Sequence, residues 1–246
     1  MKFALISDIH GNRSALEAVL DDIDDRGLTR IINLGDCLSS PLDAAGTAEL
    51  LMARDFPTVL GNHDRQLFDR PADKMGLWEA WIINDLSNRH IDWLKTFPQS
   101  FAIEDALFCH GTMADDNEMW LHMAGPQDRM INRDLAGVAD RLGETDATLI
   151  ACGHTHTADL VRLPNGPTIV NPGSVGCPAF LDDRLEPPFV FQTGTPDARY
   201  AIVEKVNGTW RADFIAVPYD ATEMVALARA RGVEDWARAL ETGWLA

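Results

Sequence analysis

Short apolar segments that end in polar clusters are the feature of this chain that most constrains its fold. KFALIS ends at Asp8, RIINL ends at Gly35-Asp36, and TVL ends at Gly61-Asn62-His63-Asp64. Helical patterns separate these segments: apolar residues of 16–23 share one helix face, and a second helix is predicted over 43–54. Alternating strands and helices predict an α/β fold, in which ligand sites lie at the carboxyl ends of strands.

After Pro98 the pattern becomes rich in strands. Strands are predicted in SFAIE, ALFCHG, TLIACGHTH, ADLVRL and TIVNPGS. Asn207-Gly208 lies between RYAIVEKV and WRADFIAV and is typical of a two-residue hairpin turn. The proline-rich stretch 177–198 is interpreted as a long loop.

Further helices are predicted where apolar residues recur at helical spacing. They cover 131–142, the tail 221–246, and 74–97, where two helices join near Ser87-Asn88. No break in composition marks a second domain in the 246 residues. We therefore expect one domain over 1–246, with a helical insertion at about 74–97 and a hairpin plus helical tail at about 199–246.

Composition limits the classes of function. A net charge of −17 and the lack of any lysine or arginine run exclude bulk binding to nucleic acid, although bound metal ions can reverse the potential locally. The four cysteines lack C-x-x-C spacing and are expected to be reduced thiols. No stretch has about 18 consecutive apolar residues, so we expect a soluble, cytoplasmic protein without a membrane span.

The polar clusters carry the chemistry. In an extended segment, side chains two residues apart point to the same side, so Asp8 with His10, and His154 with His156, could each share one ion. Taken singly, each cluster has a simpler interpretation: an exposed turn at Asp8, a helix cap at Asn62, or a satisfied buried histidine at His110.

Their conjunction indicates a metal site. Five of the seven histidines lie at glycine-flanked strand ends, while His90 and His122 are interpreted as helix-surface and loop residues. Nitrogen and oxygen donors without cysteine fit Mn, Fe, Co, Ni or Zn rather than a closed structural zinc site. Seven or eight donors are too many for one tetrahedral ion and suit two. The donors are Asp8, His10, Asp36, Asn62, His63, His110, His154 and His156.

In this ordered set the chain resembles the calcineurin-like metallophosphoesterases, in particular their small bacterial phosphodiesterase-like branch. The motifs that carry the resemblance are Asp8-Ile9-His10, Gly35-Asp36, Gly61-Asn62-His63-Asp64, His110, Gly153-His154-Thr155-His156 and Asn171-Pro172-Gly173-Ser174. The resemblance implies a two-layer sandwich of mixed β-sheets flanked by helices.

The resemblance also implies roles for single residues. Asp8, His10, Asp36 and His156 would bind one divalent transition-metal ion, with Mn foremost and Fe, Zn, Ni or Co as alternatives. Asp36, Asn62, His110 and His154 would bind a second ion, with Asp36 bridging. His63 would act as general acid beside the phosphate, oriented by Asp64. A hydroxide bridging the two metals would attack phosphorus in line.

The sequence is less specific about the substrate. Asn12 and Arg13 are candidates for contacting phosphate at a helix start, with a helix cap and a solvated base as their alternatives. Trp78, Trp81 and Trp120 are expected in the core rather than stacked on a nucleobase. Expected substrates are small phosphate esters or nucleotides, including phosphodiesters, phosphomonoesters and dinucleoside polyphosphates. A serine/threonine protein phosphatase and a catalytically silent scaffold that binds a protein are the alternatives.

Overall fold

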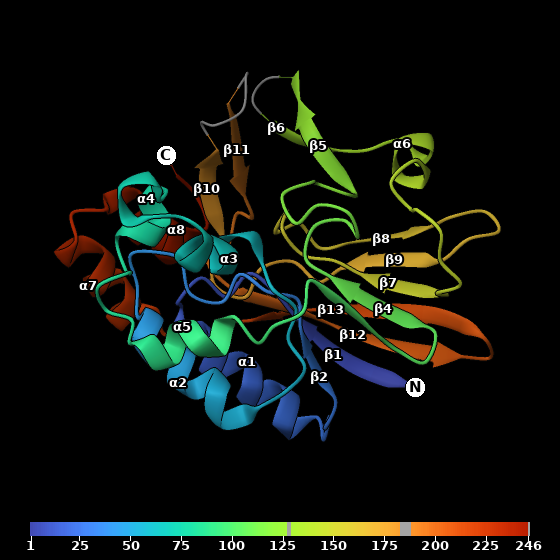
Figure 1. Cartoon of the computed structure of the whole chain (residues 1–246), viewed down its shortest axis with the longest axis horizontal. Helices are drawn as coiled ribbons and strands as arrows, with labels where there is room; N and C mark the ends of the chain where they lie inside the picture. Colours follow the sequence, from blue (N-terminus) through green and yellow to red (C-terminus); the bar gives the residue numbers. More distant parts are fainter. Residues whose placement is uncertain (127–128, 183–187, 246) are drawn as a thin grey trace.

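The computed structural model describes residues 1–126, 129–182 and 188–245, and two facing β-sheets form its centre (Figure 1). The first sheet has the order β13-β12-β1-β2. β1 pairs in parallel with β2 and antiparallel with β12, which forms the hairpin with β13. The strands are β1 (Lys2–Ile6), β2 (Ile31–Asn33), β12 (Ala198–Val206) and β13 (Thr209–Val217).

The second sheet has the order β3-β4-β7-β9-β8. Its central strands β4, β7 and β9 are parallel, and the two edge strands are antiparallel to their neighbours. The predicted two-layer sandwich of mixed sheets is therefore confirmed. The strands are β3 (Ser100–Ile103), β4 (Ala106–Cys109), β7 (Leu149–Ala151), β8 (Asp159–Arg162) and β9 (Thr168–Asn171).

β1 shows how the apolar runs build the layers. Phe3 and Leu5 face the second sheet and join the core between the sheets, whereas Ala4 and Ile6 join the core beneath the helices. Successive strand residues point to opposite faces, so a strand covered on both sides needs a continuous apolar run. The covering helices are α1 (Arg13–Asp25), α2 (Ala44–Arg54) and α5 (Asn88–Leu94).

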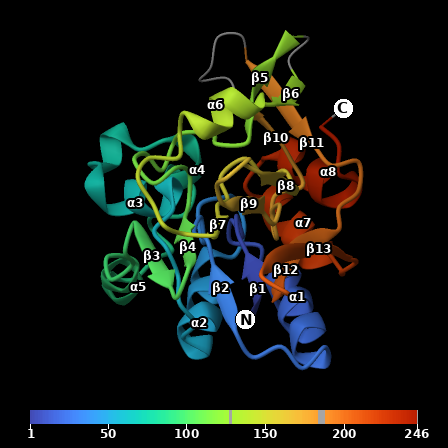
Figure 2. The same ribbon diagram turned by 90° about the vertical axis from the view of Figure 1, so that its right-hand side faces the viewer.

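A third sheet, which the sequence pattern did not predict, projects beyond the sandwich (Figures 1 and 2). Its order is β10-β11-β6-β5. The predicted loop 177–198 is wrong because its described part contains two strands; residues 183–187 lie outside the described residues. The predicted helix 131–142 is shorter, since β6 ends at Asn132 and α6 (Leu135–Ala139) follows. The strands are β5 (His122–Gly125), β6 (Arg129–Asn132), β10 (Ala179–Asp182) and β11 (Phe189–Gln192).

The remaining helices lie near this third sheet and at the sandwich edge. They are α3 (Asn62–Asp69), η1 (Ala72–Lys74), α4 (Leu77–Ala80), α7 (Thr222–Ala230) and α8 (Glu234–Thr242). The expected strand TVL forms only a single bridge, between Thr58 and Asn33. Within the described residues, no helix combines the length and the apolar character needed to cross a membrane.

Two histidines lie in other surroundings than the sequence predicted. His90 is buried in α5, where Ser87 caps the helix and Nε2 of His90 lies 2.9 Å from a carboxylate oxygen of Glu49. His122 is buried in β5, with Nδ1 2.9 Å from the hydroxyl of Thr155. Both histidines are thus buried beside a polar partner, and the predictions of a helix-surface position for His90 and a loop position for His122 are wrong.

Candidate metal centre

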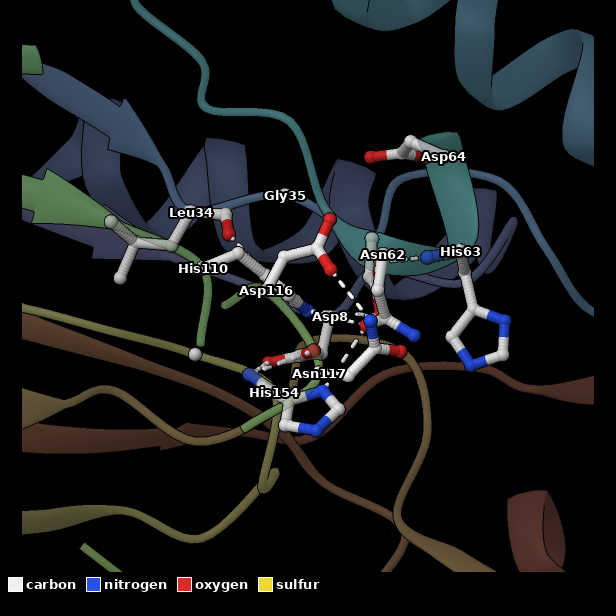
Figure 3. Close-up of polar contacts among 12 residues, drawn as sticks. Asp8, Leu34, Gly35, Asn62, His63, Asp64, His110, Asp116, Asn117 and His154 are labelled. Atoms are coloured by element: carbon white, nitrogen blue, oxygen red, sulfur yellow. Dashed lines mark hydrogen bonds and ion pairs between the residues drawn. The ribbon is translucent and has the colours of Figure 1, made fainter. Parts of the chain in front are cut away.

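The predicted ligands meet at one edge of the sandwich. Asp8 and His10 follow β1, Asp36 follows β2, His110 follows β4, and His154 with His156 follows β7, while Asn62 opens α3. Because β1 runs parallel to β2, and β4 to β7, each pair of strands brings its carboxyl ends to the same edge of its sheet. The side chains of Asp8, Asn62 and His154 point toward one another (Figure 3).

The backbone at these ligands is left-handed rather than extended. Among the described residues, nine that are not glycine have a positive φ, and five of these are predicted ligands: Asp8, His10, Asp36, His154 and His156. Alternation along an extended strand therefore does not describe either pair. Asp8 and His10 still fall in one group of candidate metal donors, as predicted, whereas His154 and His156 fall in different groups. Left-handed backbone costs on the order of 1–2 kcal/mol per residue, and such strain clusters at functional sites.

Asp8, His10 and His156 form the first cluster of donor atoms. Nε2 of His156 lies 3.4 Å from Oδ1 of Asp8 and 3.2 Å from Nε2 of His10. The Nδ1 atom of His10 donates to the carbonyl of Ser39 at 2.8 Å, and that of His156 donates to the carbonyl of Cys177 at 3.2 Å. With the proton on Nδ1, each neutral ring turns an Nε2 lone pair toward the other, and a cation between them would satisfy both.

The pKa of His10 supports the neutral form. Burial, and next the neighbouring His156, lower the pKa of His10 to about 3. A metal ligand must be deprotonated, so this imidazole meets the requirement at neutral pH.

Asp36, Asn62, His110 and His154 form the second cluster. Nε2 of His110 lies 3.1 Å from Oδ2 of Asp36 and 3.0 Å from Oδ1 of Asn62, and Nδ1 of His154 lies 3.1 Å from the same amide oxygen. Nδ1 of His110 donates to the carbonyl of Leu34 at 2.7 Å, which directs Nε2 into the cluster (Figure 3). The donor atoms of Asp36, His110 and His154 all lie within 4.8 Å of one another.

Asp36 lies between the two clusters. Its Oδ1 accepts the backbone N–H of His63 at 2.9 Å, while Oδ2 lies 3.1 Å from His110 and 3.9 Å from Nε2 of His10. Burial acts to raise the pKa of Asp36, but the charges of His110 and His63 outweigh it and hold the pKa well below its usual value. This carboxylate thus stays ionised and faces the donors of both clusters.

The pKa values of His110 and His154 are shifted in opposite directions, and the raised pKa of His110 shows that positive charge is favoured beside Asp36. Burial acts to lower the pKa of His110, yet the charge of Asp36 raises it to about 10. Burial, and next the charge of His110, lower the pKa of His154 to about 4. A divalent cation would take the place of the His110 proton, as metal binding at histidine sites releases protons.

His63 has a carboxylate partner that the sequence did not reveal. Its Nδ1 lies 2.5 Å from Oε1 of Glu79, which is buried in α4. Trp78 of the same helix stacks on the His63 ring, with centroids 4.9 Å apart and an interplanar angle of 17°. The sequence of the predicted helical insertion does not indicate that Glu79 contacts His63. The contact arises because α4 packs against α3.

The predicted role of Asp64 as the orienting partner of His63 is not what the structure shows. The side chain of Asp64 leaves α3 in a different direction from the His63 ring (Figure 3), and its Oδ1 accepts the backbone N–H of Cys37 at 2.8 Å. Burial, and next the charge of Asp36, raise the pKa of Asp64 to about 7. Asp64 therefore anchors the loop that carries Asp36.

The two predicted phosphate contacts have structural partners. Asn12 is buried, caps α1 by accepting the N–H of Ala15 at 3.1 Å, and donates to the carbonyl of Gly176 at 3.0 Å. Arg13 pairs with Glu17 at 2.8 Å on the outside of α1. The simpler alternatives, a helix cap and a solvated base, thus describe both residues.

The tryptophans divide between core and site. Trp120 is buried and donates to the carbonyl of Val138, and Trp81 packs against the helical core, as predicted. Trp78 packs against the core formed around α7 and α8, as predicted, and it also lines the cavity beside the metal clusters. That cavity has a volume of about 600 Å³ and also contains side chains of Asp36, His63, His154 and His156.

Comparisons with known proteins show the family and the fold of this chain. A family profile described as the calcineurin-like phosphoesterase superfamily domain matches residues 1–188. The chain is 26% identical over 232 residues to the uncharacterized protein MJ0912 of Methanocaldococcus jannaschii, covering 88% of this chain and 87% of that protein. It is similar to the crystal structure of a metallophosphoesterase from Sphaerobacter thermophilus, with a TM-score of 0.74, 24% identity, and coverage of 99% and 100% of the two chains. A putative diadenosine tetraphosphatase shares the fold with a TM-score of 0.54 and 17% identity, over 87% and 93% of the chains.

Proposed function

The chain belongs to the calcineurin-like phosphoesterase superfamily, and we propose that it hydrolyses a small phosphate ester with the help of two divalent metal ions. The observation that carries this proposal is the pair of neighbouring donor clusters, which approach each other at Asp36. Asp36 lies in one group with His110 and His154, and its Oδ2 is also 3.9 Å from Nε2 of His10 in the other group. Asp36 would bridge the two ions.

The donor set fits transition-metal ions. Imidazole nitrogens and carboxylate or amide oxygens suit Mn, Fe, Zn, Ni or Co, and the four cysteines in the described part of the chain lie outside both clusters. When bound, the two ions would supply Lewis-acid charge at the phosphate and lower the pKa of a coordinated water.

The protein's own residues would position the ester and deliver a proton. His63 lines the cavity next to Asp36, and its Nδ1 pairs with Glu79. A proton given to the leaving-group oxygen would therefore come from Nε2, and the Glu79 carboxylate would stabilise the protonated ring. Trp78 packs on one face of this ring and limits the access of water to it.

Metal reconstitution tests the function. Metal-stripped protein is supplied with Mn, Fe, Zn, Ni or Co and assayed on a chromogenic phosphodiester and the matching monoester. We expect metal-dependent hydrolysis, two ions per chain in the wild type, and loss of both ions and turnover in Asp36→Asn. His63→Ala should retain both ions and lose roughly 10²–10⁴-fold in kcat, the usual contribution of a general acid.

The assignment of His154 and His156 to different metal ions gives a second test. His154→Ala and His156→Ala should each weaken a different ion, because Nδ1 of His154 faces Asn62 and Nε2 of His156 faces Asp8. Metal titration of the two variants should therefore show loss of affinity at opposite sites. A single ion in the wild type, or an unchanged rate in His63→Ala, would contradict the proposal.

A further inference from the structure

The cavity beside the metal clusters combines the residues of the candidate centre with a set of large apolar side chains and further polar ones. Asp36, His63, His154 and His156 are the lining residues of that centre. Seven of the other lining residues are large and apolar, and they come from α4, from the segment after β4, and from the third sheet. They are Leu77, Trp78, Met119, Met130, Phe180, Leu181 and Phe189.

The rim of this cavity exposes apolar surface. Leu77 is 65% exposed and Leu181 is 53% exposed, the two highest values among the large apolar residues of the described chain. They stand on different elements, α4 and β10, yet line the same cavity. Contiguous exposed apolar surface at a concave site marks a place where an apolar group binds.

The apolar wall adjoins the reacting centre directly. Phe180 lies edge-on to Trp78, with centroids 6.0 Å apart, and also contacts the ring of His156 at 4.8 Å. Trp78 in turn stacks on His63. An organic group bonded directly to a phosphate at the metal clusters would therefore contact these apolar side chains.

The charges around the cavity are unfavourable for a chain of phosphates. Arg70 is the one lysine or arginine among the described residues that line it, whereas Asp36, Glu79 and Asp182 are acidic. Two metal ions can neutralise one phosphate at the candidate centre, but a chain of further phosphates would find in the described lining a single lysine or arginine, Arg70.

We propose, on the premise of the proposed function, that the substrate is an ester with one phosphorus and one bulky aromatic or apolar organic group, which the wall formed by α4 and the third sheet receives. A cavity of about 600 Å³ has the volume of sites that take such a group. Dinucleoside polyphosphates and small sugar phosphates are correspondingly disfavoured.

Non-hydrolysable ligands test this inference independently of turnover. Binding of methylphosphonate, phenylphosphonate and 1-naphthylmethylphosphonate to the metal-loaded protein is measured by calorimetry, with methylenebis(methylphosphinate) as the ligand that has two phosphorus atoms and no ring. We expect Kd to fall roughly tenfold or more from the methyl to the phenyl compound, because the ring buries apolar surface. Methylenebis(methylphosphinate) should bind more weakly than phenylphosphonate.

Matched variants locate the effect. The measured quantity is the Kd of methylphosphonate divided by the Kd of phenylphosphonate. Leu77→Ser and Leu181→Ser should each reduce this ratio severalfold, and the metal content of each variant is checked. Phe214→Ser changes an apolar residue of β13 that is 43% exposed and does not line the cavity, so it should keep the wild-type ratio.

The possible outcomes separate the two proposals. Equal affinity for methyl- and phenylphosphonate, tighter binding of methylenebis(methylphosphinate) than of phenylphosphonate, or an unchanged ratio in both leucine variants overturns the inference alone. Absence of binding by every phosphonate, together with no metal-dependent hydrolysis of any ester, contradicts the proposed function and the inference with it.

Discussion

The imidazole of His63 shows how a residue distant in sequence sets the chemistry of one side chain. The motif Gly61-Asn62-His63-Asp64 offers Asp64 as the nearest carboxylate, but Asp64 is hydrogen-bonded to the backbone of Cys37. Glu79, sixteen positions from His63, provides the contact at 2.5 Å instead. A buried carboxylate on Nδ1 fixes the ring orientation and favours its protonated form.

Glu79→Gln should lower kcat about 10- to 100-fold, the range observed when a residue that orients a catalytic group is changed. The glutamine keeps the shape of the side chain but removes its charge, so the loss should be largest for esters with basic leaving groups, which need protonation most. Metal content and KM should change little. Steady-state kinetics over a series of leaving groups provide the measurement.

Glu49→Gln is the matched control, because it also removes a carboxylate that contacts a histidine. Glu49 of α2 lies 2.9 Å from Nε2 of His90 in α5, and neither residue lines the cavity. Its kcat should equal that of the wild type. A Glu79→Gln variant whose rate is lowered equally for all leaving groups would argue against proton delivery through His63.

At the scale of elements, the site depends on how closely the start of α3 approaches the end of β2. Gly61 caps α3 with an ordinary φ of −83°, so it is not required for a left-handed backbone. A Cβ at this position would lie 2.2 Å from both the backbone nitrogen and Oδ1 of Asp36. The missing side chain therefore allows the N–H of His63 to reach Asp36.

Gly61→Ala should displace Asp36 and weaken metal binding, and it should destabilise the fold by about 1–3 kcal/mol, as overpacking does. Denaturant unfolding and metal titration measure the two effects. Gly208→Ala is a useful comparison: Gly208 has a φ of +79°, and a methyl group there would meet no atom within 4 Å, so its cost of about 1 kcal/mol should come from backbone conformation alone. Unchanged metal affinity in Gly61→Ala would refute this account.

Across the whole molecule, the candidate centre joins the two sheets and the helical layer. Its ligands follow β1 and β2 of one sheet, follow β4 and β7 of the other, and open α3. Metal ions would bind this centre only in the folded chain, because the ligands are far apart in the unfolded chain. The centre would also offset part of the net charge of −17.

Metal loading should therefore raise Tm, and a chelator should reverse the increase. At about 1,000 times Kd the stabilisation is about 4 kcal/mol per site, and 1 kcal/mol corresponds to roughly 2–4 °C for a chain of this size. Asp36→Asn should show a much smaller increase in a thermal scan with and without Mn. An equal increase in the variant would mean that the ions bind elsewhere.

Local signals in the sequence were enough to indicate the family, the two-layer sandwich and the residues gathered at the centre. Each ligand directly follows an apolar strand or opens a helix, and parallel strands bring such ends together. The resemblance also implied the division of the donors into two groups. His154 and His156 fall into different groups because left-handed backbone sets them apart, which strand alternation would not have done.

The surroundings of that centre depend on tertiary packing that no local pattern encodes. Prolines such as Pro178 and Pro188 made 177–198 resemble a loop, but they precede β10 and β11 rather than interrupt them. The pairing of Glu79 with His63 and the apolar wall that includes Trp78 depend on how α4 packs against α3 and the third sheet. Contacts between separate elements leave no periodicity in the chain, so the substrate cavity became visible only when those elements were placed in space.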